Sequence, residues 1–390
     1  MNPIVENAIN SVNSGIISFC RFITANDTGI TDSHQSGFYI PKIAYNLFFD
    51  SQGVRGGNAE KFIKIKWQDD FETDSRAIYY GQGTRNEYRL TRFGRDFPLL
   101  KEEYTGGLLI ITKISNDYYQ GYVLNEDEDI EYFLDVFGMT PADTNTLIKN
   151  GSRVFSADIE GLMNTYLASL PKDFPDTKNI AEEARNISTK LTNTVPEMVI
   201  KEPDKAIVNW LQTEYELFKK IEIHYYSNRL SSLFHSVDDF VEMAHTVINR
   251  RMSRAGKSLE HHLAATFNIN KLLFDNPGKT EGNKKPDFIF PGNNKYHDSK
   301  FTSSKLVFLG AKTTCKDRWR QILNEATRIT TKHLFTLQQG ISKNQLKEMY
   351  DSNVVLVVPQ QYISTYPEEF REKILDLSTF INFAKHKQDE

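Results

Sequence analysis

The chain has 390 residues, of which 39% are hydrophobic and 25% are charged, with a formal net charge of −4 and a pI near 6.2. This length predicts two domains of ordinary size, and the apolar content is sufficient for buried cores, which excludes global disorder. The sequence has no apolar run of about 18 residues and no secretory signal. Its two cysteines, Cys20 and Cys315, exclude a disulfide scaffold and an all-cysteine zinc site. We therefore expect a cytoplasmic protein, and the mild acidity alone argues against a nucleic-acid partner.

The charges, however, are unevenly distributed along the chain. Residues 76–95 hold five arginines against one glutamate, and residues 312–333 hold six lysines and arginines against two acids. A third basic cluster lies at residues 249–262, whereas residues 126–135 hold six acidic residues and no basic one. One basic run is usually a solvated surface, but three of them favour an anionic polymer as the partner.

The first half of the chain is predicted to begin with a helix over about residues 4–23 and to continue as short strands. The alternating segment 61–68 is typical of a half-buried strand, and further strands are predicted at 76–80, 87–93, 108–114 and 118–124. Many short strands at this spacing indicate a barrel or a sandwich. We read 1–170 as an N-terminal domain, 171–199 as a linker with some helical turns, and 200–390 as a C-terminal domain.

The second half alternates helices and strands. Apolar residues at helical spacing predict a helix over 207–225, and Ser236 with Asp239 resembles a capping box that opens a second one. From Asp287 onward the predicted order is β-β-α-β-α-β-α, with strands at 287–290, 306–311, 333–337 and 354–358. The helices are an apolar stripe at 319–329, a short helix capped by Ser342, and a last helix at 370–381. This order implies an α/β domain with a mixed sheet.

Three residues of this half could form a hydrolytic site. Asp287 precedes one predicted strand, Lys312 ends the next, and Glu325 lies two to three turns into the following predicted helix. Two carboxylates and a lysine suit metal-assisted phosphodiester hydrolysis, in which hard oxygen ligands hold Mg²⁺. Taken alone, the same spacing is better explained by turn chemistry and a solvated strand end.

The next residues along the chain favour DNA. Lys316 and Arg318 flank Asp317 just beyond Lys312. Lysine and arginine donate to guanine, and a carboxylate accepts from the cytosine amino group, so the triplet could read G·C pairs. A helix start with mixed charges is the ordinary alternative.

Several longer motifs resemble the EcoRII-like family of type II (type IIE) restriction endonucleases, in the PD-(D/E)xK superfamily. In the second half these are Ser253–Glu260, Lys284–Phe288, Tyr296–Asp298, Lys312–Gln321, Asn324–Ala326 and His333–Gln338. The first half resembles the family more patchily, at Ala25–Gly29, His34–Gln35, Gly37, Tyr39–Pro41, Arg76–Tyr80, Thr84–Glu87, Arg89, Thr91, Arg92, Gly94 and Arg95.

This resemblance implies a homodimeric, Mg²⁺-dependent endonuclease that cuts CCWGG duplex DNA, with a cognate cytosine methyltransferase as genetic partner. It implies an N-terminal B3-like barrel that binds a second, effector copy of the site and covers the catalytic cleft until then. Residue by residue, it assigns catalysis to Asp287, Lys312 and Glu325 with Glu260 in support, and metal binding to Asp287 and Glu325. It assigns base reading to Lys316, Asp317 and Arg318, a flipped-base pocket to Tyr296, and effector contacts to His34, Tyr39, Arg85, Glu87 and Arg89.

The chain departs from the family pattern at a few positions. Gly310 stands where PD-(D/E)xK enzymes have an acid, and the EcoRII-like branch carries that acid at Glu325. Gly83 and Tyr88 stand where lysines are expected in the effector arm. A DNA-binding regulator without catalysis and a repair nuclease remain the alternatives. The presence of all three catalytic residue types argues against the first, and the Lys-Asp-Arg triplet argues against the second.

Overall fold

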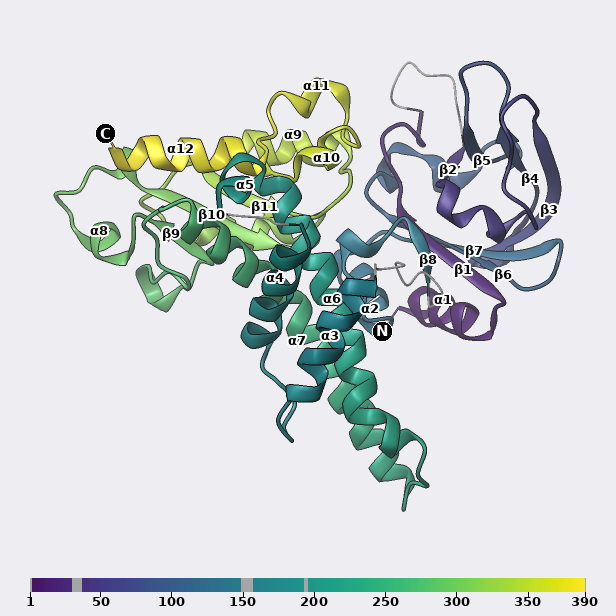
Figure 1. Ribbon diagram of the computed structural model, residues 1–390. Coiled ribbons are helices and arrows are strands. Elements are labelled where there is room, and N and C mark those ends of the chain that lie inside the picture. Colours follow the sequence, from purple (N-terminus) through teal and green to yellow (C-terminus); the bar gives the residue numbers. More distant parts are fainter. Residues whose placement is uncertain (1, 30–36, 149–156, 193–195, 390) are drawn as a thin grey trace.

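The computed structural model describes residues 2–29, 37–148, 157–192 and 196–389. A β-rich N-terminal part and an α/β C-terminal part are joined by a group of long helices (Figure 1). Within the described residues, no helix is long and apolar enough to cross a membrane.

The N-terminal part is an eight-stranded barrel-like sheet with two helices. Its strands follow the order β2-β5-β4-β3-β7-β6-β1-β8. The elements are α1 (Pro3–Ser14), β1 (Ile17–Phe22), β2 (Phe38–Ile40), β3 (Ala59–Trp67), β4 (Glu72–Tyr80), β5 (Glu87–Thr91), β6 (Leu108–Lys113), β7 (Tyr118–Leu124), α2 (Asp127–Val136) and β8 (Thr146–Ile148). Strand β3 shows why these segments form a sheet: Ile63, Ile65 and Trp67 are buried while Lys64 is exposed, the period-two pattern of a strand with one dry face.

The predicted first helix is too long. Helix α1 ends at Ser14, and residues 17–22 form β1, which pairs with both β6 and β8. Gly15 allows the turn, because a Cβ there would lie only 2.1 Å from Thr112 Cγ2. The pairing partners of β1 lie more than 80 residues away, so the local apolar pattern could not distinguish this strand from a helix.

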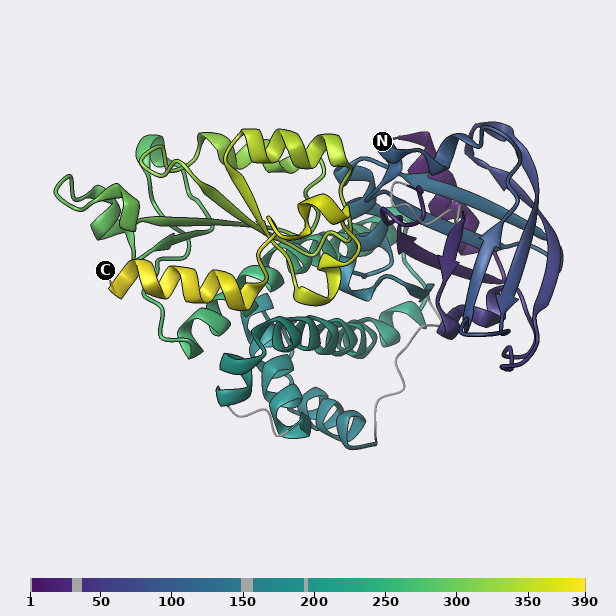
Figure 2. The ribbon, with the colours of Figure 1, turned by 90° about the horizontal axis from the view of Figure 1, so that it is seen from above.

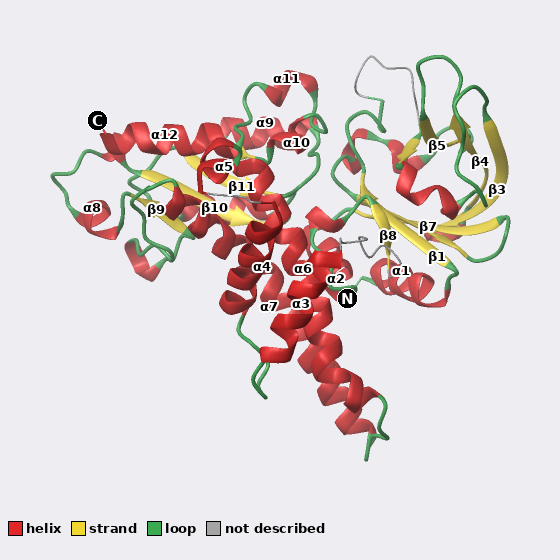
Figure 3. Ribbon diagram, in the orientation of Figure 1, coloured by secondary structure: helices red, strands yellow, loops and turns green. Residues whose placement is uncertain are grey.

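Helices fill the region between the two sheets: α3 (Ala157–Ser169), α4 (Thr177–Thr192), α5 (Pro196–Lys201), α6 (Pro203–Leu230) and α7 (Val237–Ile269). The Ser236 side chain accepts a hydrogen bond from the Asp239 backbone N–H and caps α7 as predicted. Helix α4 packs against α6 and α7, so the segment expected to be a linker holds a well-packed helix. The far end of the α6–α7 hairpin projects beyond the rest of the molecule (Figures 1 and 3).

The C-terminal part is a four-stranded sheet, mixed as predicted, and its strands follow the order β12-β11-β10-β9. Strands β9 and β10 are antiparallel, whereas β10, β11 and β12 are parallel. The elements are β9 (Phe288–Phe290), α8 (Asn293–His297), β10 (Val307–Lys312), β11 (Lys332–Thr336), α9 (Lys343–Asp351), β12 (Val354–Val357), α10 (Gln360–Ile363), α11 (Glu368–Arg371) and α12 (Leu377–Asp389). The predicted fold class, α/β with a mainly-β N-terminal unit, is confirmed.

Both faces of this sheet are buried. Side chains of α6, α7 and α12 cover one face, and those of α9 and the segment 319–329 cover the other. Figure 2 shows α9 and α12 on opposite sides of the sheet. Two helix predictions here are wrong. The stripe at 319–329 is a 3₁₀ helix over Arg318–Asn324 only, and residues 370–381 divide between α11 and α12, because Leu375 bridges to Val357 at the sheet edge.

Candidate active site and DNA interface

Asp287 and Lys312 meet at the ends of β9 and β10. The Asp287 carboxylate accepts a hydrogen bond of 2.7 Å from the Ala311 backbone N–H, and the Lys312 Nζ lies 3.8 Å from the same oxygen. Both side chains keep partial access to solvent. The antiparallel register that pairs Phe288 with Leu309 continues in this direction, so the topology of the sheet brings the two residues together.

Glu325 lies beside Asp287 and Lys312, but its backbone does not have the helical conformation that the sequence predicted. It follows the 3₁₀ helix in extended conformation, with φ −90° and ψ 146°, so its placement on a helix is wrong. Burial raises the pKa of Glu325, and the nearby charge of Asp287 raises it further, whereas Lys312 acts in the opposite direction. Gly310, two residues before Lys312 on β10, has little room for a side chain, because a Cβ there would approach Ile322 Cγ2 to 3.1 Å.

Glu260, on α7, approaches the pair from the other side of the strand ends. Burial and then the charge of Asp287 raise the pKa of Glu260. Asn276 connects the two acids, because its Nδ2 donates to the Asp287 carbonyl at 2.8 Å and to Glu260 Oε2 at 3.4 Å. The sequence prediction missed Asn276. The only local signal was its position in the loop before β9.

The carboxylates of Asp287, Glu260 and Glu325 have the charge to attract a divalent cation, although they do not form a complete metal site by themselves. Asp287 raises the pKa of both Glu260 and Glu325, so the three negative charges are close enough to repel one another, and a cation would relieve that repulsion. Among the described residues, however, no three His, Cys, Asp or Glu side chains form a ready-made metal site. Two of these carboxylates would be enough to contribute to a site for a cation such as Mg²⁺, which is usually held by one or two carboxylates together with substrate phosphates and water.

The triplet Lys316, Asp317 and Arg318 lies immediately beyond β10 and faces α2. The carboxylate of Asp127, the first residue of α2, accepts the backbone N–H groups of all three residues, at 3.1, 2.6 and 3.1 Å. The Asp127 N–H donates in return to Asp317 Oδ2 at 3.3 Å. The Lys316 ammonium is buried against Asn125, and burial lowers its pKa to about 8.

One turn further along α2, Glu131 completes this contact. Its carboxylate pairs with the Arg318 guanidinium and accepts the hydroxyls of Thr313 and Thr314 at 2.9 Å each. A cavity of about 300 Å³ remains between α2, α7 and the end of β10, and Glu131, Glu260 and Lys312 line it. This volume suits a small molecule and is far too small for a DNA duplex.

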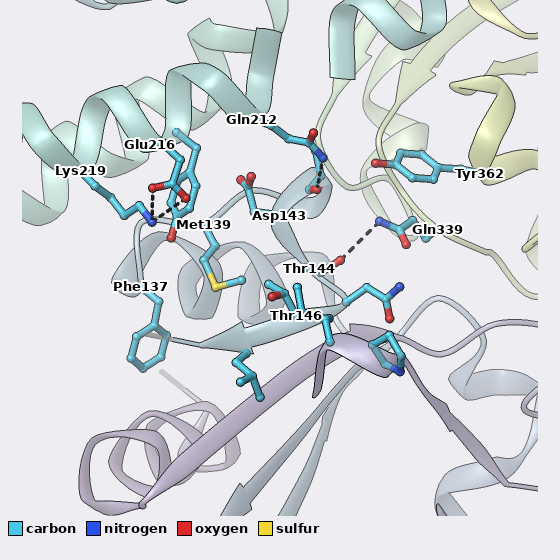
Figure 4. Close-up of a pocket in the computed structure, with 16 residues that line it drawn as sticks. Phe137, Met139, Asp143, Thr144, Thr146, Gln212, Glu216, Lys219, Gln339 and Tyr362 are labelled. Atoms are coloured by element: carbon cyan, nitrogen blue, oxygen red, sulfur yellow. Dashed lines mark hydrogen bonds and ion pairs between the residues drawn. The ribbon is translucent and has the colours of Figure 1, made fainter. Parts of the chain in front are cut away.

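Two further contacts hold the N-terminal part against the helices and the C-terminal loops. Arg251 pairs with Glu222 through two hydrogen bonds of 2.8 Å and donates to the carbonyl of Val136, at the end of α2. Gln212 and Gln339 donate to the carbonyls of Ala142 and Pro141, at 3.2 and 2.9 Å. These glutamines line a cavity of about 450 Å³ between the two parts (Figure 4).

Tyr296 is buried, with 2% of its surface exposed. Its hydroxyl donates to Glu281 Oε2 at 2.5 Å and accepts from the Arg328 N–H at 3.4 Å. Tyr296 therefore lies in the core beside the loop that carries Glu325, and its ring has no open face for a base in this conformation. Cys315 is also buried, as expected of a structural residue, and burial raises the pKa of its thiol.

The expected effector residues gather on the β2–β5–β4 edge of the barrel. Tyr39 and Arg89 are cross-strand partners, and Arg89 Nε lies 3.2 Å from Glu87 Oε1. Arg85 is exposed in the preceding turn, with its guanidinium 5.2 Å from the Tyr80 ring. His34 lies outside the described residues. Tyr88, where a lysine was expected, is buried and accepts the Gly53 N–H, so this position belongs to the barrel core.

Comparison with known proteins finds similarity for both the N-terminal and the C-terminal part of the chain. The family model of the EcoRII C-terminal domain matches residues 218–381, and that of the restriction endonuclease EcoRII N-terminal domain matches residues 12–144. The type II restriction enzyme EcoRII of Escherichia coli is 36% identical over 392 residues, which cover 93% of this chain and 92% of that one.

Two further similarities are partial. The type II restriction enzyme SsoII of Shigella sonnei is 30% identical over 117 residues, 27% of this chain and 37% of that one. A structure of metal-depleted Ecl18kI with uncleaved, modified DNA covers 59% of this chain and 84% of its own, at 19% identity and a TM-score of 0.45.

The full-length similarity, together with acids and a lysine at the ends of a mixed sheet, defines a type II site-specific DNA endonuclease. The chain belongs to the EcoRII family of restriction enzymes.

Proposed function

We propose that this endonuclease cuts CCWGG duplex DNA with Mg²⁺, using Asp287, Lys312 and Glu325 as its catalytic residues and Glu260 in support. The observation that carries the proposal is the position of Lys312. It ends β10 beside Asp287, and the Lys316–Arg318 triplet begins only four residues further on. The residues that cleave the phosphodiester bond and those that read the bases would therefore both lie at the end of β10.

Each side chain has a role that follows from its place. Asp287 and Glu325 would hold the cation, which when bound polarises the scissile phosphate and lowers the pKa of water. Lys312, a charged donor next to Asp287, would orient the attacking water and stabilise charge that develops on the phosphate. Glu260 would keep Asn276, and through it the backbone at Asp287, in position.

The base contacts follow from donor and acceptor types. Lys316 and Arg318 would donate to guanine O6 and N7, and Asp317 would accept from cytosine N4. These groups are engaged with Asp127, Asn125 and Glu131 in this conformation. Base reading therefore requires that α2 move away.

We infer that this conformation is autoinhibited and that effector DNA relieves it. The Tyr39–Arg89 edge of the barrel would bind the effector copy, with Arg85, Glu87 and His34 in support. Helix α2 belongs to the same folded part as that edge, and it contacts α1 and α7. Effector binding could thus be coupled to release of the triplet through α2.

A homodimer is proposed because cutting both strands of a duplex requires two catalytic centres. The projecting α6–α7 hairpin offers a surface for a second copy. Its large apolar side chains are exposed: Ile223, Leu230, Leu233, Val237, Phe240, Val241 and Met252. Sedimentation of Leu233→Asp should show a monomer where the unchanged protein is a dimer, and an unaltered dimer would argue for another interface.

The test of the whole proposal is digestion of a plasmid with several CCWGG sites, with and without Mg²⁺, for the unchanged protein and Lys312→Ala. We expect site-specific cuts only for the unchanged protein with Mg²⁺. Sequencing of fragment ends reports the site and the cut position together. Family membership favours this function over a silent regulator or a repair nuclease, and binding without cutting, or cutting without sequence preference, would reverse that preference. A restriction enzyme of this kind implies a cytoplasmic location and a cognate cytosine methyltransferase.

A further inference from the structure

The loop that follows Glu325 is held by polar side chains from three separate segments. Lys332, the first residue of β11, is buried, and its ammonium donates to the carbonyls of Ala326 at 2.5 Å and Ile329 at 2.7 Å. Glu281 accepts the Thr327 N–H on its Oε1 at 2.5 Å. Ala326 has a positive φ of 49°, a conformation that is unfavourable for alanine and persists only where its surroundings fix it.

The same groups are tied to each other and to the chain before Glu325. The second oxygen of Glu281 accepts the Tyr296 hydroxyl at 2.5 Å. On the other side of Glu325, the Lys284 ammonium donates to the Asn324 carbonyl. The backbone on both sides of Glu325 is therefore held by side chains from outside the loop. These side chains are Lys284, Glu281 and Lys332, and all three are charged.

Lys332 brings a buried charge into this network. A lysine buried beside two carbonyls and an aromatic ring, 5.1 Å from the Phe308 centroid, must give up most of its hydration, which is costly unless the geometry repays it. An apolar side chain would fill the same space beneath the sheet. The loop held in this way is the one that carries Glu325 to the strand ends.

We propose that Lys332 and Glu281 are positioning residues that fix the Glu325 carboxylate for metal binding, with Tyr296 orienting Glu281. The inference rests on the proposed function, since it assumes that Glu325 is a metal ligand. Neither Lys332 nor Glu281 touches substrate in this role. Both act through the backbone of residues 326–329, in the way that outer groups around metal sites commonly orient the ligands.

The test uses full-length Lys332→Met and Glu281→Gln with saturating effector DNA. Methionine keeps the apolar stem of Lys332 and removes its donors. Glutamine keeps the length of Glu281 and weakens its acceptors, and this partly exposed site is less prone to misfold. Lys373→Met is the control for loss of a lysine over an aromatic ring, because the Lys373 ammonium lies 5.2 Å from the Phe370 centroid on an exposed side chain.

Two measurements separate positioning from folding. The first is Mn²⁺ affinity by calorimetric titration into the complex with uncleavable phosphorothioate DNA, where we expect roughly 10-fold weaker binding for both variants and unchanged affinity for the DNA itself. The second is a double-mutant cycle of cleavage rates with Glu325→Gln. Lys332→Met should slow cleavage by about 10- to 100-fold alone and should have almost no further effect when Glu325 is already changed.

The outcomes distinguish the two levels of the proposal. If Glu325→Gln cuts like the unchanged protein, the proposed catalytic site fails and the positioning role fails with it. If Glu325→Gln cuts much more slowly than the unchanged protein while Lys332→Met and Glu281→Gln bind Mn²⁺ and cut like Lys373→Met, only the positioning role is overturned. Additive effects of Lys332→Met and Glu325→Gln would likewise overturn it. Tyr296→Phe provides the last check, since loss of the hydroxyl should weaken Mn²⁺ binding although the ring remains.

Discussion

Asp127 and Asp317 exchange hydrogen bonds across the boundary between the barrel and the α/β part. The Asp127 carboxylate accepts the Asp317 N–H at 2.6 Å, and the Asp127 N–H donates to the Asp317 carboxylate at 3.3 Å. An acid thus occupies the row of N–H groups at the start of the 3₁₀ helix, a place where an anion is favoured. The contact covers the groups proposed to read DNA.

Asp127→Asn should therefore raise basal cleavage of a substrate with a single site. The amide accepts the backbone N–H groups less strongly than the carboxylate does, and a loss of about 1–2 kcal/mol shifts the ratio of open to closed molecules by roughly 5- to 30-fold. The measurement is the cleavage rate without effector DNA, compared with the rate at saturating effector, which should not change. Glu128→Gln is the matched control, because Glu128 is exposed one residue further along the same helix. Equal basal rates for the two variants would contradict the role of Asp127.

The pH dependence of the proposed autoinhibition should follow Asp135, near the end of α2. Burial raises its pKa to about 7 in the closed conformation, with Glu131 acting in the same direction and Arg254, Arg318 and Arg251 opposing it. The closed form therefore binds a proton that an open, solvated carboxyl, with its ordinary pKa near 4, would release. Between about pH 4 and 7 the closed form loses stability relative to the open form as the pH rises, and above that range the effect is complete.

This dependence is measured as the ratio of basal to effector-stimulated cleavage, because the ratio cancels the pH dependence of the chemistry itself. We expect the ratio to increase between pH 5.5 and pH 7.5, roughly the upper part of that window. Asp135→Asn, which stays neutral, should flatten the curve. A curve of unchanged steepness in Asp135→Asn would assign the effect to other groups, of which Glu126 beside Asp317 is the first to examine, since burial also raises the pKa of Glu126.

Asn276→Ala should slow cleavage by about 10-fold and leave DNA binding unchanged. The Asn276 amide is the shared donor to the Asp287 carbonyl and the Glu260 carboxylate, and its loss leaves the partly buried Glu260 carboxyl beside Asp287 with one donor fewer. Single-turnover cleavage at saturating Mg²⁺ measures the effect. Asn294→Ala, at an exposed position of α8, provides the comparison, and similar rates for both variants would exclude a role for Asn276.

Arg85→Ala should weaken stimulation by a second DNA copy without altering the chemistry. Arg85 is exposed in the turn before β5, next to the Tyr39–Arg89 edge, where a guanidinium can contact phosphate. Loss of one phosphate contact should lower the affinity for effector DNA and make its salt dependence less steep by about one unit. The readout is the effector concentration that gives half-maximal stimulation at two salt concentrations, and an unchanged value at both would refute the role.

The sequence alone determined the parts of the fold that depend on local pattern. Alternation over residues 61–68 marked β3, Ser236 marked the start of α7, and the strand order after Asp287 implied the mixed sheet. The family motifs were also local in sequence, since Lys312 to Arg318 forms one uninterrupted run. Together with the other family motifs, that run indicated the class of enzyme before any geometry was known.

Only the tertiary structure decided the conformation of segments whose contacts come from residues far away in the sequence. Residues 17–22 became a strand because β6 and β8 pair with it, and Glu325 lies in an extended loop because Lys332 and Glu281 hold that loop. The acidic run at 126–135 and the basic cluster at 312–333 were visible in the sequence, but only the tertiary structure shows that Asp127 faces Asp317, 190 residues later. Hydrogen bonds and ion pairs act over a few ångströms in space, so the charge of each segment does not by itself determine which other segment it contacts.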